Sequence, residues 1–163
     1  MLSDDEKRRI RDSWRLVVPI QETAADLFYR RLFQLAPDYR ALFPEEMSAQ
    51  KRKLVTMLAF VVRSLDWPEE AWREEVDETD DLFLVVLALG RRHSQLYNIP
   101  DEAYRVVGEA LIWTLDQGLG AAFTPETRNA WLRVYDAVSR TMMLGSAGLE
   151  LGTPISTAEG GGP

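Results

Sequence analysis

The sequence predicts an all-α protein that forms a single domain, and three observations support this fold class. Apolar side chains recur every three to four residues along most of the chain, which is the spacing of one helix face. No stretch shows the alternation of apolar and polar residues that is typical of a half-buried β-strand. The 163 residues, 46% of them hydrophobic, suffice for one sizeable core and leave no room for a second catalytic domain.

Three helices are predicted in the first 65 residues. Ser3 and Glu6 form a capping-box pattern before a helix that we expect to end ahead of Pro19. The stretch ETAADLFYRRLFQLAP predicts a second helix with an aromatic inner face, which stops before Pro37. The third helix covers residues 48–65, and Ser48 is its candidate N-cap.

The second half of the chain begins with an acidic connection. Nine of the sixteen residues 66–81 are Asp or Glu, so we interpret this segment as solvated, with at most one short helix. Further helices are predicted over residues 81–97, 101–120 and 123–144, and Thr124 and Pro125 have the residue types of an N-cap and a first helical position. Residues 145–163 are rich in Gly and small side chains and predict a disordered tail, so the domain is expected to cover residues 1–144.

The composition excludes several classes of function and site. A net charge of -7 argues against nucleic acid or an anionic membrane as the main partner. The absence of cysteine excludes disulfide scaffolds, thiolate metal sites and covalent c-type haem attachment, and it accords with a reducing compartment. The N-terminal residues are too polar for a signal peptide, and no apolar run is long enough to cross a membrane. We therefore expect a soluble, cytoplasmic protein.

His93 is the only histidine in the chain, and it follows the apolar stretch LFLVVLAL. The residues alone leave three interpretations open: a surface residue, a core residue with bonded ring nitrogens, or a metal ligand. An ordinary zinc site needs three or four protein ligands, which this chain does not offer without a second His or a Cys. Haem iron needs only one axial ligand from the protein, because the porphyrin supplies four nitrogens. No sequence signature links a nucleophile to His93 for hydrolysis.

The order of five motifs resembles the globin family. DLFYRRLFQLAPDYRALF is similar to the second globin helix and the corner after it, SAQKRKLVTML to the distal helix, and LGRRHSQLY to the proximal helix. YRVVGEAL and FTPETRNAWLRVY are similar to the next helix and to the start of the last. The likeness runs from about residue 5 to residue 143 and is strongest toward single-domain bacterial globins related to the haem domain of flavohaemoglobins. It implies a 3-on-3 helical sandwich around haem b, here with a lengthened acidic connection between the distal and proximal helices.

The resemblance also implies roles for individual residues. His93 matches the proximal ligand to iron, and Leu89 the leucine beneath the haem. Tyr29 and Gln50 match the two distal polar positions, where a phenol and an amide would donate hydrogen bonds to O₂ and slow its release. The further haem contacts implied are Phe43, Lys53, Leu54, Val107 and Leu111, of which Leu54 also walls the ligand pocket.

Plainer interpretations of these residues remain open at this point. Tyr29 is alternatively a core aromatic residue whose hydroxyl bonds elsewhere, and Gln50 a solvent-facing amide. Lys53 either contacts a haem propionate or belongs to a solvated face. Val107 and Leu111 are also consistent with ordinary core positions.

The function that the resemblance implies is reversible O₂ binding, with no catalytic residues. NO and CO are further candidate ligands, and a monomer or a weak homodimer is expected. Nitric oxide dioxygenase activity with a separate reductase is one alternative, and a globin-fold sensor or signalling module is another. The dioxygenase alternative is weakened because Ser146 stands where flavohaemoglobin-like globins have a glutamate that supports the proximal histidine, although Tyr104 matches their tyrosine.

Overall fold

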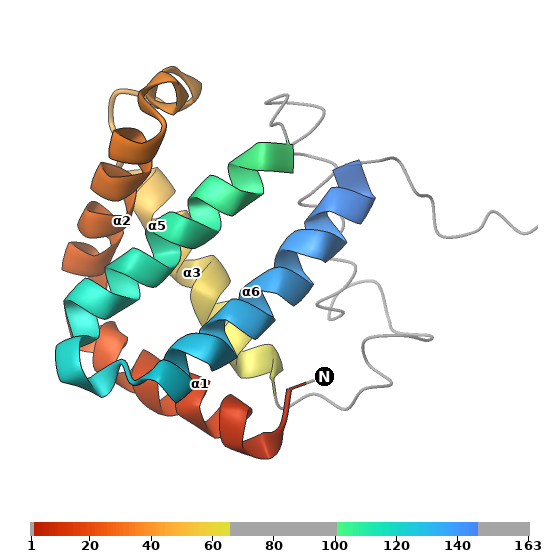
Figure 1. The fold of residues 1–163 in the computed structure, drawn as a ribbon. Helices are drawn as coiled ribbons and strands as arrows, with labels where there is room; N and C mark the ends of the chain where they lie inside the picture. The colour runs from red at the N-terminus through yellow and green to blue at the C-terminus, as the bar shows by residue number, and fades with distance from the viewer. Residues whose placement is uncertain (1, 66–100, 147–163) are drawn as a thin grey trace, which may run out of the picture.

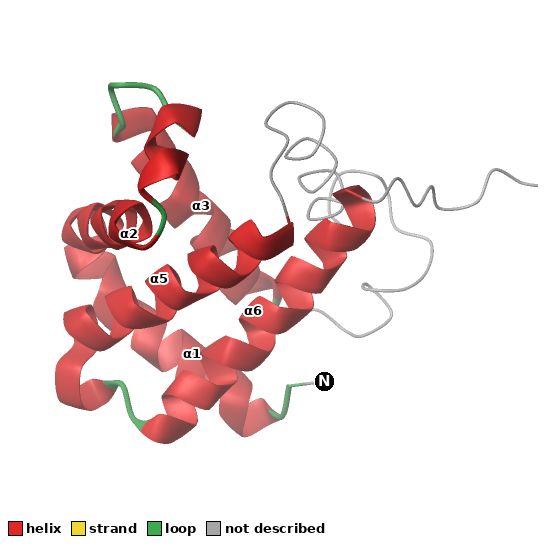
Figure 2. Ribbon diagram, turned by 45° about the horizontal axis from the view of Figure 1, so that its top comes forward, coloured by secondary structure: helices red, strands yellow, loops and turns green. Residues whose placement is uncertain are grey.

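The computed structural model describes residues 2–65 and 101–146, and all regular structure in these two ranges is helical (Figure 2). Short 3-10 helices, labelled η, join several of the longer α-helices. In chain order the elements are α1 (Asp4–Val17), η1 (Val18–Ile20), α2 (Gln21–Leu35), η2 (Pro37–Leu42), α3 (Ser48–Ser64), α5 (Asp101–Leu119), η4 (Gly120–Ala122) and α6 (Pro125–Ser146).

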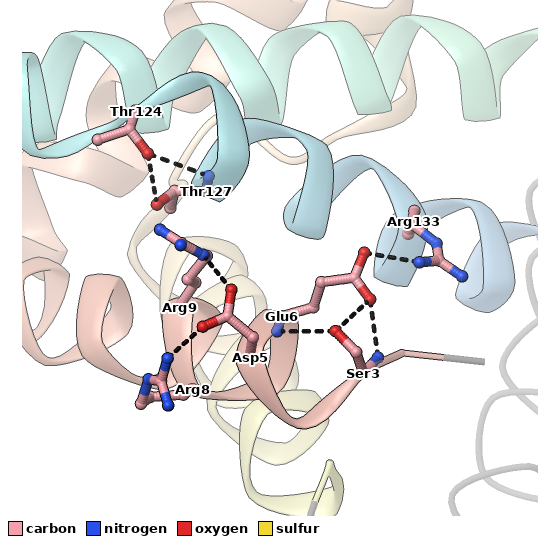
Figure 3. Close-up of polar contacts among 8 residues, drawn as sticks. All are labelled: Ser3, Asp5, Glu6, Arg8, Arg9, Thr124, Thr127 and Arg133. Carbon is pink, nitrogen blue, oxygen red and sulfur yellow. Dashed lines mark hydrogen bonds and ion pairs between the residues drawn. The ribbon is translucent and has the colours of Figure 1, made fainter.

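The first helix begins as its sequence predicts. The Ser3 hydroxyl accepts the Glu6 backbone N–H at 3.3 Å, and a Glu6 carboxylate oxygen accepts the Ser3 backbone N–H at 2.7 Å, which completes the capping box (Figure 3). Helix α1 ends at Val17, ahead of Pro19, which lies in η1. Local capping and a proline therefore fix both ends of α1, and the prediction for this helix is confirmed.

Three other predicted helix ends can be compared with the structure. Helix α2 ends at Leu35, before Pro37, as expected. Helix α6 begins at Pro125, and the Thr124 hydroxyl accepts the Thr127 backbone N–H at 3.3 Å (Figure 3), so the predicted N-cap is confirmed. The assignment of Ser48 as an N-cap is wrong. Ser48 is the first residue of α3 and Met47 occupies the N-cap position, while the Glu46 side chain accepts the Ser48 N–H at 3.0 Å and its hydroxyl proton as well.

The helices of the described ranges pack against one another around one core. Helices α5 and α6 lie side by side, with α3 behind them in the view of Figure 1. Helix α2 packs on α5 and on α3, and α1 packs mainly on α6. The core lies between these helices and includes residues of α1, α2, α5 and α6 that the sequence spacing places on inner faces.

Trp131 of α6 is the largest fully buried side chain in the described ranges, at 1% exposure. Its ring lies 6.4 Å from the ring of Trp14 on α1. Its indole N–H donates to the Ser13 hydroxyl at 2.9 Å, and that hydroxyl donates to the Ile10 carbonyl at 2.9 Å. Every polar atom of this buried chain of bonds therefore has a partner.

Several predictions fall on residues outside the described ranges. These are the acidic connection 66–81, the helix over 81–97 that includes Leu89 and His93, and the tail beyond Ser146. Helix α6 extends through Ser146, two residues past the boundary predicted for the tail. No helix in the ranges 2–65 and 101–146 is long and apolar enough to cross a membrane.

Candidate functional site

Tyr29 lies at the junction of α2 and α3 and is 5% exposed. Its hydroxyl donates a hydrogen bond to the backbone carbonyl of Gln50 with an O–O distance of 3.4 Å. Burial raises the pKa of the Tyr29 phenol above its ordinary value, and the side chain of Gln50 partly opposes this rise. The hydroxyl therefore keeps its proton at neutral pH and is a hydrogen-bond donor there.

Three phenylalanines surround the Tyr29 ring. Phe28 and Phe43 meet it edge to face, with ring centres 5.0 and 5.6 Å away, and the Phe33 ring lies 6.0 Å away in a tilted arrangement. Phe33 and Phe43 are themselves in edge contact at 5.5 Å. Such contacts hold each ring at a defined angle, so this aromatic cluster orients the phenol of Tyr29.

Arg40 stabilises the corner after α2 by hydrogen bonds. Its guanidinium donates to the carbonyls of Phe43, Pro44 and Glu45 at 3.2, 3.1 and 3.2 Å, and it lies 5.6 Å from the centre of the Phe33 ring. Arg40 thereby sets the path of the chain around Phe43. The sequence analysis missed this residue, although its position three residues before Phe43 in an apolar corner is a usable signal.

A salt bridge joins α2 to the start of α3. Lys51 Nζ lies 2.7 Å from Asp26 Oδ1; Asp26 is about one helical turn before Tyr29 on α2, and Lys51 directly follows Gln50 on α3. The two side chains are 35% and 52% exposed, so the pair contributes little to stability by itself. It joins the two helices beside Tyr29. The residues are far apart in sequence, and no local pattern predicts their pairing.

The apolar face of α3 is only partly covered. Leu54, Val55, Met57, Leu58 and Phe60 are all half-buried, whereas the buried residues of this helix lie near its C-terminal end. Such a face suits a large, flat and mostly apolar group, because burying it would remove further apolar surface from water. The partly covered face of α3 and the protonated phenol next to it are the features of the described ranges that fit a haem.

The other residues expected at the site differ in their surroundings. Leu54 and Leu111 line one apolar cavity of about 20 Å³ together with Phe28, and Leu111 is also buried in the core. Val107 is half-buried against the same core, and Lys53 is exposed. Gln50 is half-buried; its backbone carbonyl accepts the Tyr29 hydroxyl, and its side chain is close enough to lower the pKa of that phenol. His93 and Leu89 lie in the part of the chain that the structure leaves undescribed.

Comparison with known proteins identifies relatives along almost the whole chain. Residues 26–142 match the family model described as Globin. The chain is 31% identical to the neuroglobin of Danio rerio over 156 residues, which cover 90% of this chain and 93% of that protein. The neuroglobins of Tetraodon nigroviridis and Chaenocephalus aceratus are each 29% identical over the same shares. The family model therefore covers α3, α5 and nearly all of α6, and it includes Tyr29 near its start.

Proposed function

This chain belongs to the globin family, with the all-α globin fold, and we propose that it uses haem b to bind O₂ reversibly, with His93 as the proximal iron ligand and Tyr29 as the main distal donor. Membership in the family implies haem binding and a small gas ligand. The haem supplies the ferrous iron that takes up the gas. The protein supplies the ligand to that iron, the apolar enclosure and the hydrogen-bond donors.

The observation that carries this proposal is the state of the Tyr29 hydroxyl. It is buried and protonated, and its present acceptor lies 3.4 Å away, beyond the ordinary range for a strong hydrogen bond between oxygens. Turning this hydroxyl toward a better acceptor therefore costs little. A gas ligand that gains partial negative charge is such an acceptor, and a net gain on the order of 1 kcal/mol or more would slow its release.

Gln50 contributes in two ways in this proposal. Its backbone carbonyl holds the Tyr29 hydroxyl when no ligand is present, and its half-buried amide is a second donor on the same turn of α3. The aromatic cluster of Phe28, Phe33 and Phe43 keeps the phenol at one angle in both states, so only the hydroxyl proton has to turn.

The remaining contacts enclose the haem. Phe43, Leu54, Leu89, Val107 and Leu111 would provide apolar contact, and the exposed position of Lys53 suits an ion pair with a propionate at the edge of the porphyrin. Leu54 would also limit the space for the ligand on the distal side. These side chains exclude water, which strengthens each hydrogen bond made inside the pocket.

An absorption spectrum of the purified protein tests haem binding. We expect a Soret band in the wild-type protein that is lost or strongly altered in His93→Ala. A colourless protein after reconstitution with haem would overturn the proposal. A band unchanged in His93→Ala would overturn the assignment of the proximal ligand.

Stopped-flow measurement of O₂ release tests the distal donor. We expect Tyr29→Phe to release O₂ about tenfold faster or more, because each 1.4 kcal/mol of lost stabilisation corresponds to a factor of ten. Tyr135→Phe is the matched control, since its hydroxyl bonds the Tyr104 carbonyl between α5 and α6, and it should leave the rate unchanged. Equal rates in Tyr29→Phe and the wild-type protein would contradict the role of Tyr29.

A turnover measurement distinguishes nitric oxide dioxygenase activity from reversible O₂ binding. A single round of nitrate formation from the oxygenated protein does not make the chain an enzyme. Sustained nitrate formation with a separate reductase would assign a dioxygenase function and replace reversible O₂ binding as the conclusion. We expect a single round only.

A further inference from the structure

The two halves of α3 are packed very differently. Near its end the helix contributes Val61, Val62, Ser64 and the following Leu65 to the buried interior. Over residues 48–60 no side chain of α3 is buried. Few buried apolar contacts therefore oppose a local opening of the first half, so the free energy of that opening is lower than for the rest of the helix.

Two polar contacts join this half of α3 to α2. The Tyr29 hydroxyl donates to the Gln50 carbonyl at 3.4 Å, which is a long and weak hydrogen bond. Lys51 Nζ lies 2.7 Å from Asp26 Oδ1, and a bond between opposite charges at this length is about twice as strong as one between neutral groups. Lys51 directly follows Gln50. The ion pair is therefore the stronger contact at the point where α3 presents Gln50 to Tyr29.

Lys51 has a second carboxylate in its neighbourhood, that of Glu46 in the corner before α3. Hydrogen bonds from Ser48, and then the charges of Arg52 and Lys51, hold the pKa of Glu46 below its ordinary value. The Lys51 ammonium nevertheless forms its ion pair with Asp26, across on α2. If Asp26 loses its charge, Lys51 can turn to Glu46. The cation then stays paired but no longer joins α3 to α2.

The exposure of this ion pair limits its strength. The two side chains are 35% and 52% exposed, and pairs of this kind shift an equilibrium by up to about fivefold. Such a shift is small compared with the equilibrium constant for unfolding of the whole domain. It is large for the local opening of a helix half that has no buried side chain. The pair therefore affects the separation of α3 from α2 more than it affects global stability.

We propose that Asp26 and Lys51 are positioning residues that hold the first half of α3 against α2 and thereby set how fast a gas ligand enters and leaves the space beside Tyr29. This inference rests on the proposed O₂ binding. In it neither charged side chain contacts the ligand, and both act through Gln50. When the pair separates, the turn that carries Gln50 moves away from Tyr29 and the ligand passes. Because one opening serves entry and release, the pair changes both rates by the same factor and leaves the affinity nearly unchanged.

Rates of O₂ association and release in the full-length, haem-loaded protein test this role. We expect Asp26→Asn and Lys51→Gln each to raise both rates about threefold, whereas loss of a donor to the ligand raises release alone. The double variant D26N/K51Q should match either single variant, because the interaction is lost only once. Arg52→Gln is the matched control, since it removes a positive charge from the next residue, which is exposed and outside the pair, and it should leave both rates unchanged.

Hydrogen exchange of the backbone amides tests the opening itself, without a gas ligand. We expect residues 53–57 to exchange about threefold faster in Asp26→Asn than in Arg52→Gln, with α6 unchanged. Equal exchange of this segment in the two variants would overturn the proposal. Faster exchange with unchanged rates of O₂ association and release would overturn the role of the pair in gas entry. A protein without a Soret band after reconstitution would instead refute the O₂ binding on which the inference rests, and the spectrum identifies that cause.

Discussion

The contact between α1 and α6 and the junction between α2 and α3 each depend on a buried hydroxyl, but they hold it in different ways. At the first contact the Ser13 hydroxyl makes two hydrogen bonds of 2.9 Å, one with the Trp131 indole and one with the Ile10 carbonyl. At the second the Tyr29 hydroxyl makes one bond of 3.4 Å, next to apolar side chains of α3 that are only half-buried. At the first contact the protein's own residues provide every hydrogen bond of the buried hydroxyl. At the second, the weakly bonded hydroxyl and the half-buried side chains of α3 leave hydrogen-bonding capacity and apolar surface for a bound group.

Ion pairs at the surface also differ between the α1 and α6 contact and the α2 and α3 junction. Arg133 of α6 pairs with Glu6 of α1 at 2.6 Å, and the same Glu6 carboxylate closes the capping box with Ser3 (Figure 3). Bonds that connect residues so far apart in sequence stabilise the fold because they form only when both helices are in place. The α2 and α3 junction has one such bond at its surface, between Asp26 and Lys51.

The largest loss of stability is expected for Trp131→Ala. This change removes the largest fully buried side chain and leaves a cavity between α1 and α6, which typically costs about 3–5 kcal/mol. Urea denaturation followed by circular dichroism measures the loss. Leu132→Ala, at the exposed neighbouring position, is the control and should change stability by less than about 0.5 kcal/mol. A similar loss for both variants would contradict the assignment of Trp131 to the core.

Ser13→Ala is expected to have the next largest effect. The substitution leaves the buried Trp131 N–H without its acceptor, and an unsatisfied buried donor costs about 1–3 kcal/mol. Denaturation with urea measures the change, and Ser139→Ala is the control, because the hydroxyl of Ser139 bonds only a carbonyl of its own helix, that of Asp136. A Ser13→Ala variant no less stable than Ser139→Ala would show that the contact between α1 and α6 does not depend on this hydroxyl.

Local features and long-range contacts differ in how well the sequence predicts them. The prolines at 19 and 37 and the Thr124 cap act on their immediate neighbours, so the ends of α1 and α2 and the start of α6 are predicted correctly. The bond between Ser13 and Trp131 connects residues 118 apart, and no local pattern indicates it. Helical spacing places both residues on inner faces, but only the packing of α1 on α6 brings the donor to the acceptor.

The same limit applies to the candidate site. The resemblance to globins selects Tyr29 and Gln50 by residue type and order, and both are at the α2 and α3 junction. It does not predict that Gln50 accepts through its backbone, because this depends on how closely α3 approaches α2. Ser48 shows a related failure: its N–H and hydroxyl both donate to the Glu46 side chain, and Met47 occupies the N-cap position one residue earlier.

Glu6→Gln tests the ionic part of the contact between α1 and α6. The Ser3 backbone N–H, and then Arg133, hold the pKa of Glu6 below its ordinary value. A carboxyl with a lowered folded-state pKa stabilises the protein above its unfolded pKa of about 4.3, and this contribution is lost as the pH falls through the folded value. The variant should be less stable by roughly 1 kcal/mol at pH 7.

The pH dependence separates this charge effect from a general effect on the helix. The difference in stability between Glu6→Gln and the wild-type protein should close as the pH falls from the unfolded pKa through the lower folded-state pKa of Glu6, because below that value both side chains are neutral. Glu22→Gln, at an acidic residue in the first turn of α2, is the control and should show a smaller difference. A difference in stability between Glu6→Gln and the wild-type protein that stays constant on acidification would contradict a role for the charge of Glu6.

The smallest effect on stability is expected for Tyr29→Phe, and it separates the two regions most directly. Phenylalanine keeps the ring contacts with Phe28, Phe33 and Phe43, and the lost hydrogen bond of 3.4 Å is weak. The acceptor is a backbone carbonyl within α3, which the helix or water satisfies after the change. We therefore expect a loss below about 0.5 kcal/mol, less than for Ser13→Ala, although both variants remove one buried hydroxyl. Urea denaturation of the two variants under the same conditions decides the point. If Tyr29→Phe lowers the stability as much as Ser13→Ala does, then the hydrogen bond of the Tyr29 hydroxyl stabilises the fold. Turning that hydroxyl toward a ligand would then no longer be a low-cost motion.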